Sequence, residues 1–292
     1  MTAGEVRFPV AWGELAGLRI AHPGAPKVIA LHGWLDNAAS FLPLASRLPP
    51  LDLLLLDLPG HGRSGHLPAG TEYAATTAIH ALLDAADALG WDRFALLGHS
   101  MGAGIAALAA VAAPGRVERL ALIETLGPLA EEPGQAPARL RDAVAATRAL
   151  PGKSLRVFAD LAAPVRARML ANQLSESSAR LLVERGTRPC DGGLVWSSDP
   201  RLTLPNAQRM DEARVRALLA AIGCPVQVLF AEPAQAYFPD PVRRARAAAL
   251  GDGHVHVLAG THHLHMEQPE QVASLLGPFL AGAAEAGLTA MP

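Results

Sequence analysis

Cysteine is scarce in this chain, and neither sign of charge predominates. Among the 292 residues only Cys190 and Cys224 are cysteines, and they have no C-x-x-C spacing. This excludes a disulfide scaffold and indicates free thiols in a reducing compartment. The formal net charge is −2, which gives no electrostatic reason to expect nucleic acid or an anionic membrane as a partner.

Targeting and membrane-spanning patterns are missing as well. The start of the chain, MTAGEVR, has no basic region followed by an apolar one, so we predict no signal peptide. Only the alanine-rich stretch after Ser100 reaches the length of a membrane span, and we interpret it as a core helix. With 50% hydrophobic and 18% charged residues, the chain has ample material for a buried core. We expect a soluble cytoplasmic protein.

Apolar strands alternate with helices through most of the sequence. After a hairpin expected over 5–22, apolar runs predict strands at 28–31, 53–56, 94–97, 119–123, 225–230 and 254–258. Helix-spaced apolar residues predict helices at 38–48, 71–89, 105–113, 211–221, 241–250 and 269–284. This alternation is typical of a mostly parallel sheet, whose ligands bind beyond the carboxyl ends of the strands. Arg243, Arg244 and Arg246 are interpreted as the solvated face of a helix.

Residues 127–210 interrupt the alternation. Helical pieces joined by Pro, Gly and Ser are predicted at 139–150, 155–170 and 175–185. We expect an α/β core formed by 1–126 and 211–292, and a helical lid formed by 127–210.

The most informative stretch is FALLGHSMGAG at 94–104, where an apolar run meets G-x-S-x-G and then small helical residues. This pattern is typical of a strand, a sharp turn and a helix. Gly98 and Gly102 would let the strand and the helix approach closely, and Ser100 would project its hydroxyl above the sheet. The backbone N–H of Met101, at the helix start, would face an oxyanion formed beside that serine.

Three further motifs accompany the serine: H-G-W at 32–34, D-L-P-G-H-G-R-S at 57–64 and G-T-H-H-L-H-M-E-Q-P at 260–269. Together with G-H-S-x-G, they resemble the motifs of the α/β-hydrolase superfamily across all but the middle third of the chain. The H-H-L-H-M-E run is similar to the serine hydrolase-like branch. The resemblance implies an α/β-hydrolase fold with a mostly parallel eight-stranded sheet, flanking helices and a helical lid after strand six.

The resemblance also implies a base for the serine. A serine hydroxyl is a poor nucleophile unless a histidine takes its proton during attack. In the family pattern this histidine stands five residues before the Glu and seven before the Pro of G-x-H-x4-E-x-P. Counting from Glu267, that histidine is His262, and His263 is the alternative because a short loop allows a shift of one residue.

The acid of the triad departs from the commonest family pattern. The histidine needs a carboxylate to hold its tautomer and to stabilise the imidazolium. After the strand at 225–230 the family usually has an aspartate, whereas this chain has A-E-P-A at 231–234. Two candidates remain. Glu124 ends the preceding strand, where some superfamily members such as dehalogenases take their acid, and Glu232 is the alternative.

Other residues of the motifs are expected to support the site. The resemblance implies that the backbone of Trp34 joins Met101 in the oxyanion hole, while the indole of Trp34 lines the pocket. His32 is expected to brace its loop. Asp57, His61 and Arg63 are expected to hold neighbouring loops.

These residues favour a serine-dependent hydrolase of an ester or related acyl compound, without cofactor or metal. Carbon–carbon bond hydrolysis or haloperoxidase-like chemistry would use the same triad, whereas Ser100 argues against epoxide hydrolase and dehalogenase chemistry. An inactive binding protein is an alternative because the usual aspartate is missing. The H-x-H-x-E spacing at 263–267, with His254 and His256, suggests a metallohydrolase as another. The apolar lid favours an uncharged, moderately apolar small-molecule substrate, and the sequence indicates no oligomeric state.

Overall fold

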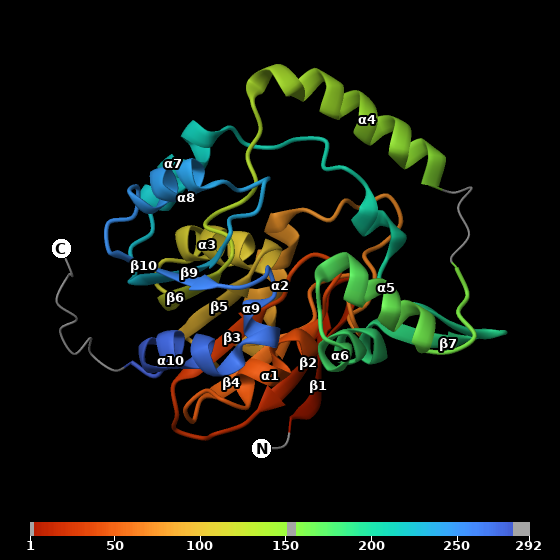
Figure 1. Cartoon of the computed structure of the whole chain (residues 1–292), viewed down its shortest axis with the longest axis horizontal. Coiled ribbons are helices and arrows are strands. Elements are labelled where there is room, and N and C mark those ends of the chain that lie inside the picture. Colours follow the sequence, from red (N-terminus) through yellow and green to blue (C-terminus); the bar gives the residue numbers. More distant parts are fainter. Residues whose placement is uncertain (1–2, 151–155, 283–292) are drawn as a thin grey trace.

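The computed structural model describes residues 3–150 and 156–282. An eight-stranded sheet runs through its centre in the order β1-β2-β4-β3-β5-β6-β9-β10 (Figure 1). The strands are β1 Gly4–Val10, β2 Gly13–Ile20, β3 Lys27–Leu31, β4 Asp52–Leu56, β5 Phe94–His99, β6 Val117–Ile123, β9 Val226–Glu232 and β10 Gly253–Ala259. β2 pairs antiparallel with β1 and β4, and every other neighbouring pair is parallel. The predicted mostly parallel eight-stranded sheet is therefore confirmed.

Helices cover both faces of this sheet (Figure 1). One layer contains α2 Ala75–Ala88, α3 Met101–Ala112, α7 Glu212–Ala220 and α8 Asp240–Ala247; the other contains η1 Ala38–Phe41, α1 Leu42–Ala45, α9 Leu264–Glu267 and α10 Pro269–Leu280. Strand β4 shows why the apolar runs are continuous. Leu54 and Leu56 pack with α2 and α3, whereas Leu53 and Leu55 pack with α1 and α10, because successive strand side chains point to opposite faces.

The helices of the core match the predicted periodicity, with small differences at their ends. The helix expected at 71–89 is α2, and the one expected at 105–113 is α3, which begins directly after Ser100. The helix expected at 269–284 is α10, which ends at Leu280, and Ala284 lies outside the described residues. Within the described part of the chain, no helix combines the length and the apolar composition that crossing a membrane requires.

Between β6 and α7 the chain leaves the central sheet, as Figure 1 shows. We call this segment, residues 127–210, the excursion. This excursion contains η2 Pro133–Gln135, α4 Ala136–Ala149, α5 Ala162–Asn172, α6 Glu176–Gly186, β7 Thr187–Cys190, β8 Gly193–Trp196 and η4 Pro200–Thr203. The helix expected at 155–170 begins only at Ala162, and Leu155 lies outside the described residues. The β7–β8 hairpin was not predicted, although Asp191-Gly192-Gly193 at its turn is a typical hairpin signal, and both glycines have positive φ.

The strand register brings the candidate residues to one edge of the sheet. His99, the last residue of β5, pairs with Ile123, the last residue of β6. Ser100 and Glu124 therefore follow neighbouring parallel strands at the same level, and the Ser100 amide donates to the Ile123 carbonyl at 2.9 Å. Ile123 in turn pairs with Leu229 of β9. The sheet thus aligns the serine with one of the two candidate acids.

Candidate active site

Ser100 occupies a strained turn between β5 and α3. Its φ of 50° and ψ of −117° lie outside the regions that L-residues usually adopt, as expected for a nucleophile held at the tip of a strand-to-helix turn. The flanking glycines make this turn possible. A Cβ on Gly98 would lie 2.5 Å from the Cα of Ala103, and one on Gly102 would lie 2.0 Å from the Leu31 carbonyl oxygen. Neither contact can be relieved by a side-chain movement.

Ser100, His262 and Glu124 form one chain of hydrogen bonds. The Ser100 hydroxyl lies 2.9 Å from Nε2 of His262, and Nδ1 of the same ring lies 2.9 Å from Oε2 of Glu124. A carboxylate only accepts, so Nδ1 carries the proton and Nε2 is left to accept from the serine. This is the tautomer that a general base for serine requires. The ring of His262 is partly exposed, with 21% of its side chain accessible, whereas the Glu124 carboxylate is fully buried.

Several donors hold the Glu124 carboxylate in place. Its Oε1 accepts a hydrogen bond from the backbone N–H of Ala231, and Nη2 of Arg243 lies 3.4 Å from the same oxygen. Ala231 is the first residue of A-E-P-A, the segment where the family usually has its aspartate. The backbone of that segment therefore supports an acid that comes from the neighbouring strand, and Glu124 has a φ of 69° at the point where it leaves β6.

The alternative acid and base do not join this chain. Glu232 is exposed at the end of β9, and no hydrogen bond or ion pair between described residues joins its carboxylate to His262. His263 is buried and directs Nε2 to Oδ2 of Asp36, at 3.2 Å, instead of to Ser100. Geometry therefore separates the two candidates in each pair.

The two expected oxyanion donors come from the start of α3 and from the loop after β3. Met101 is the first residue of α3, so its N–H has no partner within the helix. Trp34 follows β3, and neither its amide nor that of Met101 donates a hydrogen bond to another described residue. The indole of Trp34 is 54% exposed and donates to the Leu202 carbonyl at 2.8 Å. This contact ties the loop after β3 to η4 of the excursion.

The arginines of α8 were interpreted wrongly as a solvated face. Arg243 and Arg246 are only 4% and 1% exposed, and Arg244 alone points to solvent. Arg243 donates to the Ala231 carbonyl at 2.7 Å besides approaching Glu124. Arg246 pairs with Glu212. The spacing of three residues placed both side chains on one face of the helix, and this face is the inner one. It meets the buried carboxylate of Glu124 and the partly exposed carboxylate of Glu212.

Tyr237 is a site residue that the sequence analysis did not identify. Its hydroxyl lies 3.4 Å from Nδ1 of His262, and burial, followed by the charge of Glu124, raises its pKa. Tyr237 also lines a cleft of about 220 Å³ together with Leu129, Phe238, Val242, Glu131 and others. The loop after β9 thus brings an aromatic side chain to the base from a position that carries no motif.

His32 and His61 brace the loops below the site, as expected. Nδ1 of His32 donates to the Gly33 carbonyl at 2.8 Å, and Nε2 accepts from the Leu58 amide at 3.0 Å. Burial lowers the pKa of His32 to about 4. Burial, followed by the neighbouring His32 ring, lowers the pKa of His61 to about 3. Both rings are therefore neutral at pH 7.

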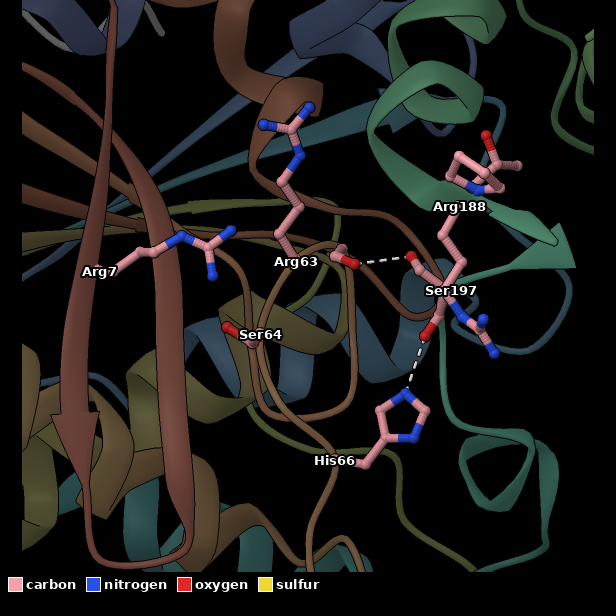
Figure 2. A pocket seen from close by; sticks show the side chains of 9 residues that line it. Arg7, Arg63, Ser64, His66, Arg188 and Ser197 are labelled. Atoms are coloured by element: carbon pink, nitrogen blue, oxygen red, sulfur yellow. Dashed lines mark hydrogen bonds between the residues drawn. The ribbon is translucent and has the colours of Figure 1, made fainter. Parts of the chain in front are cut away.

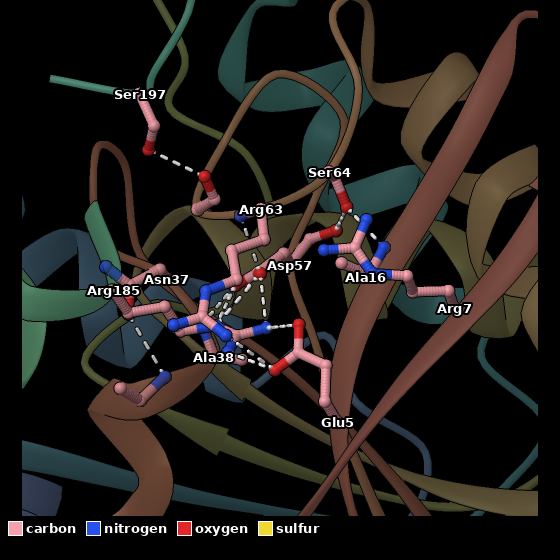
Figure 3. Close-up of polar contacts among 12 residues, drawn as sticks. Glu5, Arg7, Ala16, Asn37, Ala38, Asp57, Arg63, Ser64, Arg185 and Ser197 are labelled. Atoms are coloured by element: carbon pink, nitrogen blue, oxygen red, sulfur yellow. Dashed lines mark hydrogen bonds and ion pairs between the residues drawn. The ribbon is translucent and has the colours of Figure 1, made fainter. Parts of the chain in front are cut away.

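Asp57 joins the core to the excursion through an ion pair (Figure 3). Its carboxylate, fully buried, accepts from the amides of Ala38 and Arg63 and from the guanidinium of Arg185, whose Nη2 lies 2.7 Å away. Arg185 belongs to α6, and its Nη1 lies 2.9 Å from the Glu5 carboxylate of β1. Asp57 and Arg63 hold loops, as expected. The ion pair of Asp57 with Arg185 of the excursion was not predicted from the sequence.

A separate groove of about 420 Å³ lies at the seam between the core and the excursion (Figure 2). Arg7 of β1 and Arg63 of the loop after β4 line one part, and Arg188 of β7 lines another. His66 is hydrogen bonded to the Ser197 carbonyl at 2.8 Å across this seam. None of the three residues of the Ser–His–Glu chain lines the groove, so its volume is not where the serine would meet a substrate.

The H-x-H-x-E spacing at 263–267 does not gather its members around one point. Glu267 accepts instead from the backbone amide and the hydroxyl of Ser175, each at 3.1 Å. His254 and His256 stand together on β10, with ring centroids 4.6 Å apart. The potential ligand group that the described residues do form consists of Asp36, His99 and His263.

Comparisons with known proteins agree with this geometry. A family model for the alpha/beta hydrolase fold matches residues 26–227. Serine hydrolase-like protein from Danio rerio is 31% identical over 288 residues, which cover 95% of this chain and 88% of that protein. Serine hydrolase-like protein 2 from Homo sapiens is 30% identical over 295 residues, which cover 94% and 93%.

Solved structures show the same similarity. The crystal structure of hypothetical protein PA1622 from Pseudomonas aeruginosa PAO1 aligns with a TM-score of 0.88 at 41% identity, and the alignment covers 95% of this chain and 99% of that one. A thioesterase domain from the curacin biosynthetic pathway shares the fold, with a TM-score of 0.79 at 24% identity over 94% and 99%. Because the family model spans more than half of the chain and the relatives nearly all of it, the chain belongs to the α/β-hydrolase superfamily, in its serine hydrolase-like branch.

Proposed function

We propose that this protein hydrolyses an uncharged, moderately apolar ester through an acyl-enzyme formed on Ser100. The observation that carries the proposal is the continuous hydrogen-bond chain from the Ser100 hydroxyl through His262 to Glu124, with both distances at 2.9 Å. A histidine next to a serine would not by itself favour catalysis. A histidine whose tautomer is fixed by a buried carboxylate, and which faces a serine on a strained turn, does.

The reaction follows from these contacts. The Ser100 oxygen attacks the ester carbonyl carbon while Nε2 of His262 takes the hydroxyl proton, and Glu124 stabilises the resulting imidazolium. Collapse of the tetrahedral intermediate breaks the ester bond, and His262 gives the proton to the leaving alcohol. Water then attacks the acyl-enzyme by the same steps, which release the acid and restore the serine.

The backbone amides of Trp34 and Met101 are the proposed donors to the oxyanion. Both are free of other hydrogen bonds within the described residues, so they remain available to a charge that develops only during the reaction. Each donor of this kind contributes on the order of 3 kcal/mol to transition-state stabilisation.

The preference for an apolar substrate rests on the large apolar side chains that the excursion and the loops after β3 and β9 expose. Large apolar side chains are rarely exposed without a function when they gather in one region. In this chain, most of those seen among the described residues come from the loops after β3 and β9 or from the excursion: Trp34, Leu129, Leu140, Val144, Val157, Leu170 and Tyr237. We therefore propose that the segment 127–210 acts as a lid whose inner side receives the acyl or alcohol group.

The first experiment is hydrolysis of p-nitrophenyl esters of increasing acyl length by the wild type and a set of variants. Ser100→Ala and Glu124→Gln are expected to lower kcat/KM by at least about 10³-fold, because each removes a member that acts with the others as a unit. Glu232→Gln is the matched control and is expected to stay within about twofold. His262→Gln is expected to lower kcat/KM at least about tenfold more than His263→Gln does.

Two outcomes would overturn the proposal. A larger loss of kcat/KM in Glu232→Gln than in Glu124→Gln would assign the acid to the end of β9. A wild type without turnover on the ester series, in which a serine-directed phosphonate also fails to label Ser100, would favour a binding protein that has kept the fold.

A further inference from the structure

A second cluster of polar side chains lies directly behind the Ser–His–Glu chain. Asp36 comes from the loop after β3, His99 is the last residue of β5 and precedes Ser100, and His263 follows His262. The exposed fractions of these three residues are 3%, 0% and 2%. Two loops of the site and the end of β5 thus meet at one buried point that the proposed reaction does not use.

The geometry of the cluster suits a metal ion. Oδ2 of Asp36 lies 3.2 Å from Nε2 of His263 and 3.8 Å from Nδ1 of His99, and the three ligand atoms all lie within 4.8 Å of one another. In a tetrahedral zinc site, bonds of about 2.1 Å place neighbouring ligand atoms about 3.4 Å apart. The distance of 3.2 Å to His263 is slightly shorter than that separation, and the distance of 3.8 Å to His99 is slightly longer.

His99 presents a lone pair to this point. Its Nε2 lies 2.8 Å from the His262 carbonyl oxygen, which can only accept, so the proton of the ring is on Nε2. Nδ1 therefore has a lone pair, is buried, and has no hydrogen-bond partner among the described residues. It faces Oδ2 of Asp36, which is also an acceptor. Two acceptors that face each other in a buried place repel unless a cation lies between them.

The cluster thus brings one carboxylate oxygen and two imidazole rings to a single buried point. These are groups that bind transition metals in proteins.

The backbone leaves space on the same side. A Cβ on Gly33 would lie 3.0 Å from Oδ2 of Asp36 and 3.0 Å from Nδ1 of His99. Glycine thus leaves open a position next to both ligand atoms where any other residue would place a carbon. His263 can supply Nε2 if its ring proton moves to Nδ1. This exchanges the Nε2–H hydrogen bond to Asp36 for a bond to the metal, and it leaves a buried N–H without an acceptor among the described residues.

We propose that Asp36, His99 and His263 bind one divalent transition ion of the zinc class, which ties two loops of the site to the end of β5. Two imidazole nitrogens and one carboxylate oxygen favour zinc over magnesium or calcium, which prefer oxygen ligands alone. The ion supplies no nucleophile, because Ser100 keeps that role in the proposed function. Arg168 of α5 pairs with Oδ1 of Asp36, so its positive charge repels the metal ion and lowers the affinity of the cluster for it.

The test measures metal binding apart from catalysis. Protein treated with a chelator and then desalted is titrated with Zn²⁺, bound metal is counted by elemental analysis, and Co²⁺ replaces zinc to report coordination by its visible absorption. We expect one equivalent in the wild type and in Ser100→Ala. Asp36→Asn and His263→Gln should bind more than about tenfold more weakly. Arg168→Met should bind more tightly than the wild type, and this variant keeps the test valid if a ligand variant fails to fold.

The two histidines of β10, exposed His254 and partly buried His256, provide the matched control. His254→Gln combined with His256→Gln removes an imidazole pair of similar ring spacing outside the cluster, and this variant should still bind one equivalent. Binding below one equivalent in the wild type, binding that persists in Asp36→Asn, or loss of binding in the β10 variant would overturn the proposal. Because Ser100→Ala tests the metal without turnover, this failure is distinct from a failure of the proposed function.

Discussion

Replacing Arg185 with glutamine leaves a buried carboxylate without its cation. Asp57 is fully buried, and Nη2 of Arg185 lies 2.7 Å from it. Without the guanidinium, the carboxylate retains the amides of Ala38 and Arg63 at 2.7 and 2.9 Å. Those two hydrogen bonds satisfy part of its acceptor capacity but do not neutralise its charge. Breaking one side of a buried pair in this way costs about 3–5 kcal/mol, and we expect the lower end because the two amides remain.

The assay is urea unfolding at pH 7, with Asp57→Asn, Arg185→Gln and the double variant forming a cycle. A coupling free energy of about 2 kcal/mol or more is expected, with little dependence on salt because the pair is buried. Arg63→Gln is the control: the guanidinium of Arg63 is half exposed and pairs with Glu5 at 3.2 Å, so its removal should cost less than about 1 kcal/mol. An Arg185→Gln variant within 1 kcal/mol of the wild type would show that the excursion does not depend on this pair.

Three further predictions concern the bracing histidine, the serine turn and the tyrosine beside the base. The folded-state pKa of His32 is about 4, below the unfolded value of about 6.5, so its stabilising contribution is complete above pH 6.5 and is lost as the pH falls toward 4. That loss amounts to about 3 kcal/mol. As the pH is lowered, the free energy of unfolding should therefore fall less steeply in His32→Gln than in the wild type. Parallel curves for the two proteins would contradict this. Gly102→Ala should prevent stable folding, because its Cβ would lie 2.0 Å from a backbone oxygen of β3. Gly115→Ala is the control and should be tolerated, because its Cβ meets no atom within 4 Å. Circular dichroism and expression yield test this, and a well-folded Gly102→Ala protein would contradict it. Tyr237→Phe should lower kcat less than about fivefold, because a hydroxyl 3.4 Å from His262 makes a weak contact; a loss as large as that of Glu124→Gln would give the phenol a role in the proton transfer.

The serine turn and the sheet could be predicted because their causes are local. An apolar run, two glycines around a serine and a following run of small residues allow one compact arrangement. The clashes that a Cβ would make at Gly98 and Gly102 are the physical reason for that pattern. The same holds for β4, whose unbroken run of leucines corresponds to a strand buried on both faces.

The choice between Glu124 and Glu232 could not be made from local pattern. It depends on the register between β6 and β9, which brings the Ala231 amide to the Glu124 carboxylate. Both glutamates end a strand, and only their surroundings in space distinguish them: one is buried among donors, and the other is exposed. Register between strands that lie about a hundred residues apart in the sequence is set by packing of the whole sheet.

Buried charges were the least predictable part of the site. Arg243, Arg246 and Arg185 look like surface residues in the sequence, since arginine is rarely buried without a partner. Their partners, Glu124, Glu212 and Asp57, lie at least 34 positions away along the chain. A helix with two arginines three positions apart carried the only local signal.

The position of Glu124 has a consequence for changing this protein. Because the proposed acid follows β6, the loop after β9 carries no triad side chain. The end of β9 contributes the Ala231 amide, and the loop contributes Tyr237 beside the base. The residues between these two can therefore be randomised in a library while nucleophile, base and acid stay in place. In a relative with its acid after β9, most variants in the same library would lose the acid and be inactive. This loop is thus the natural starting point for directed evolution of substrate selectivity.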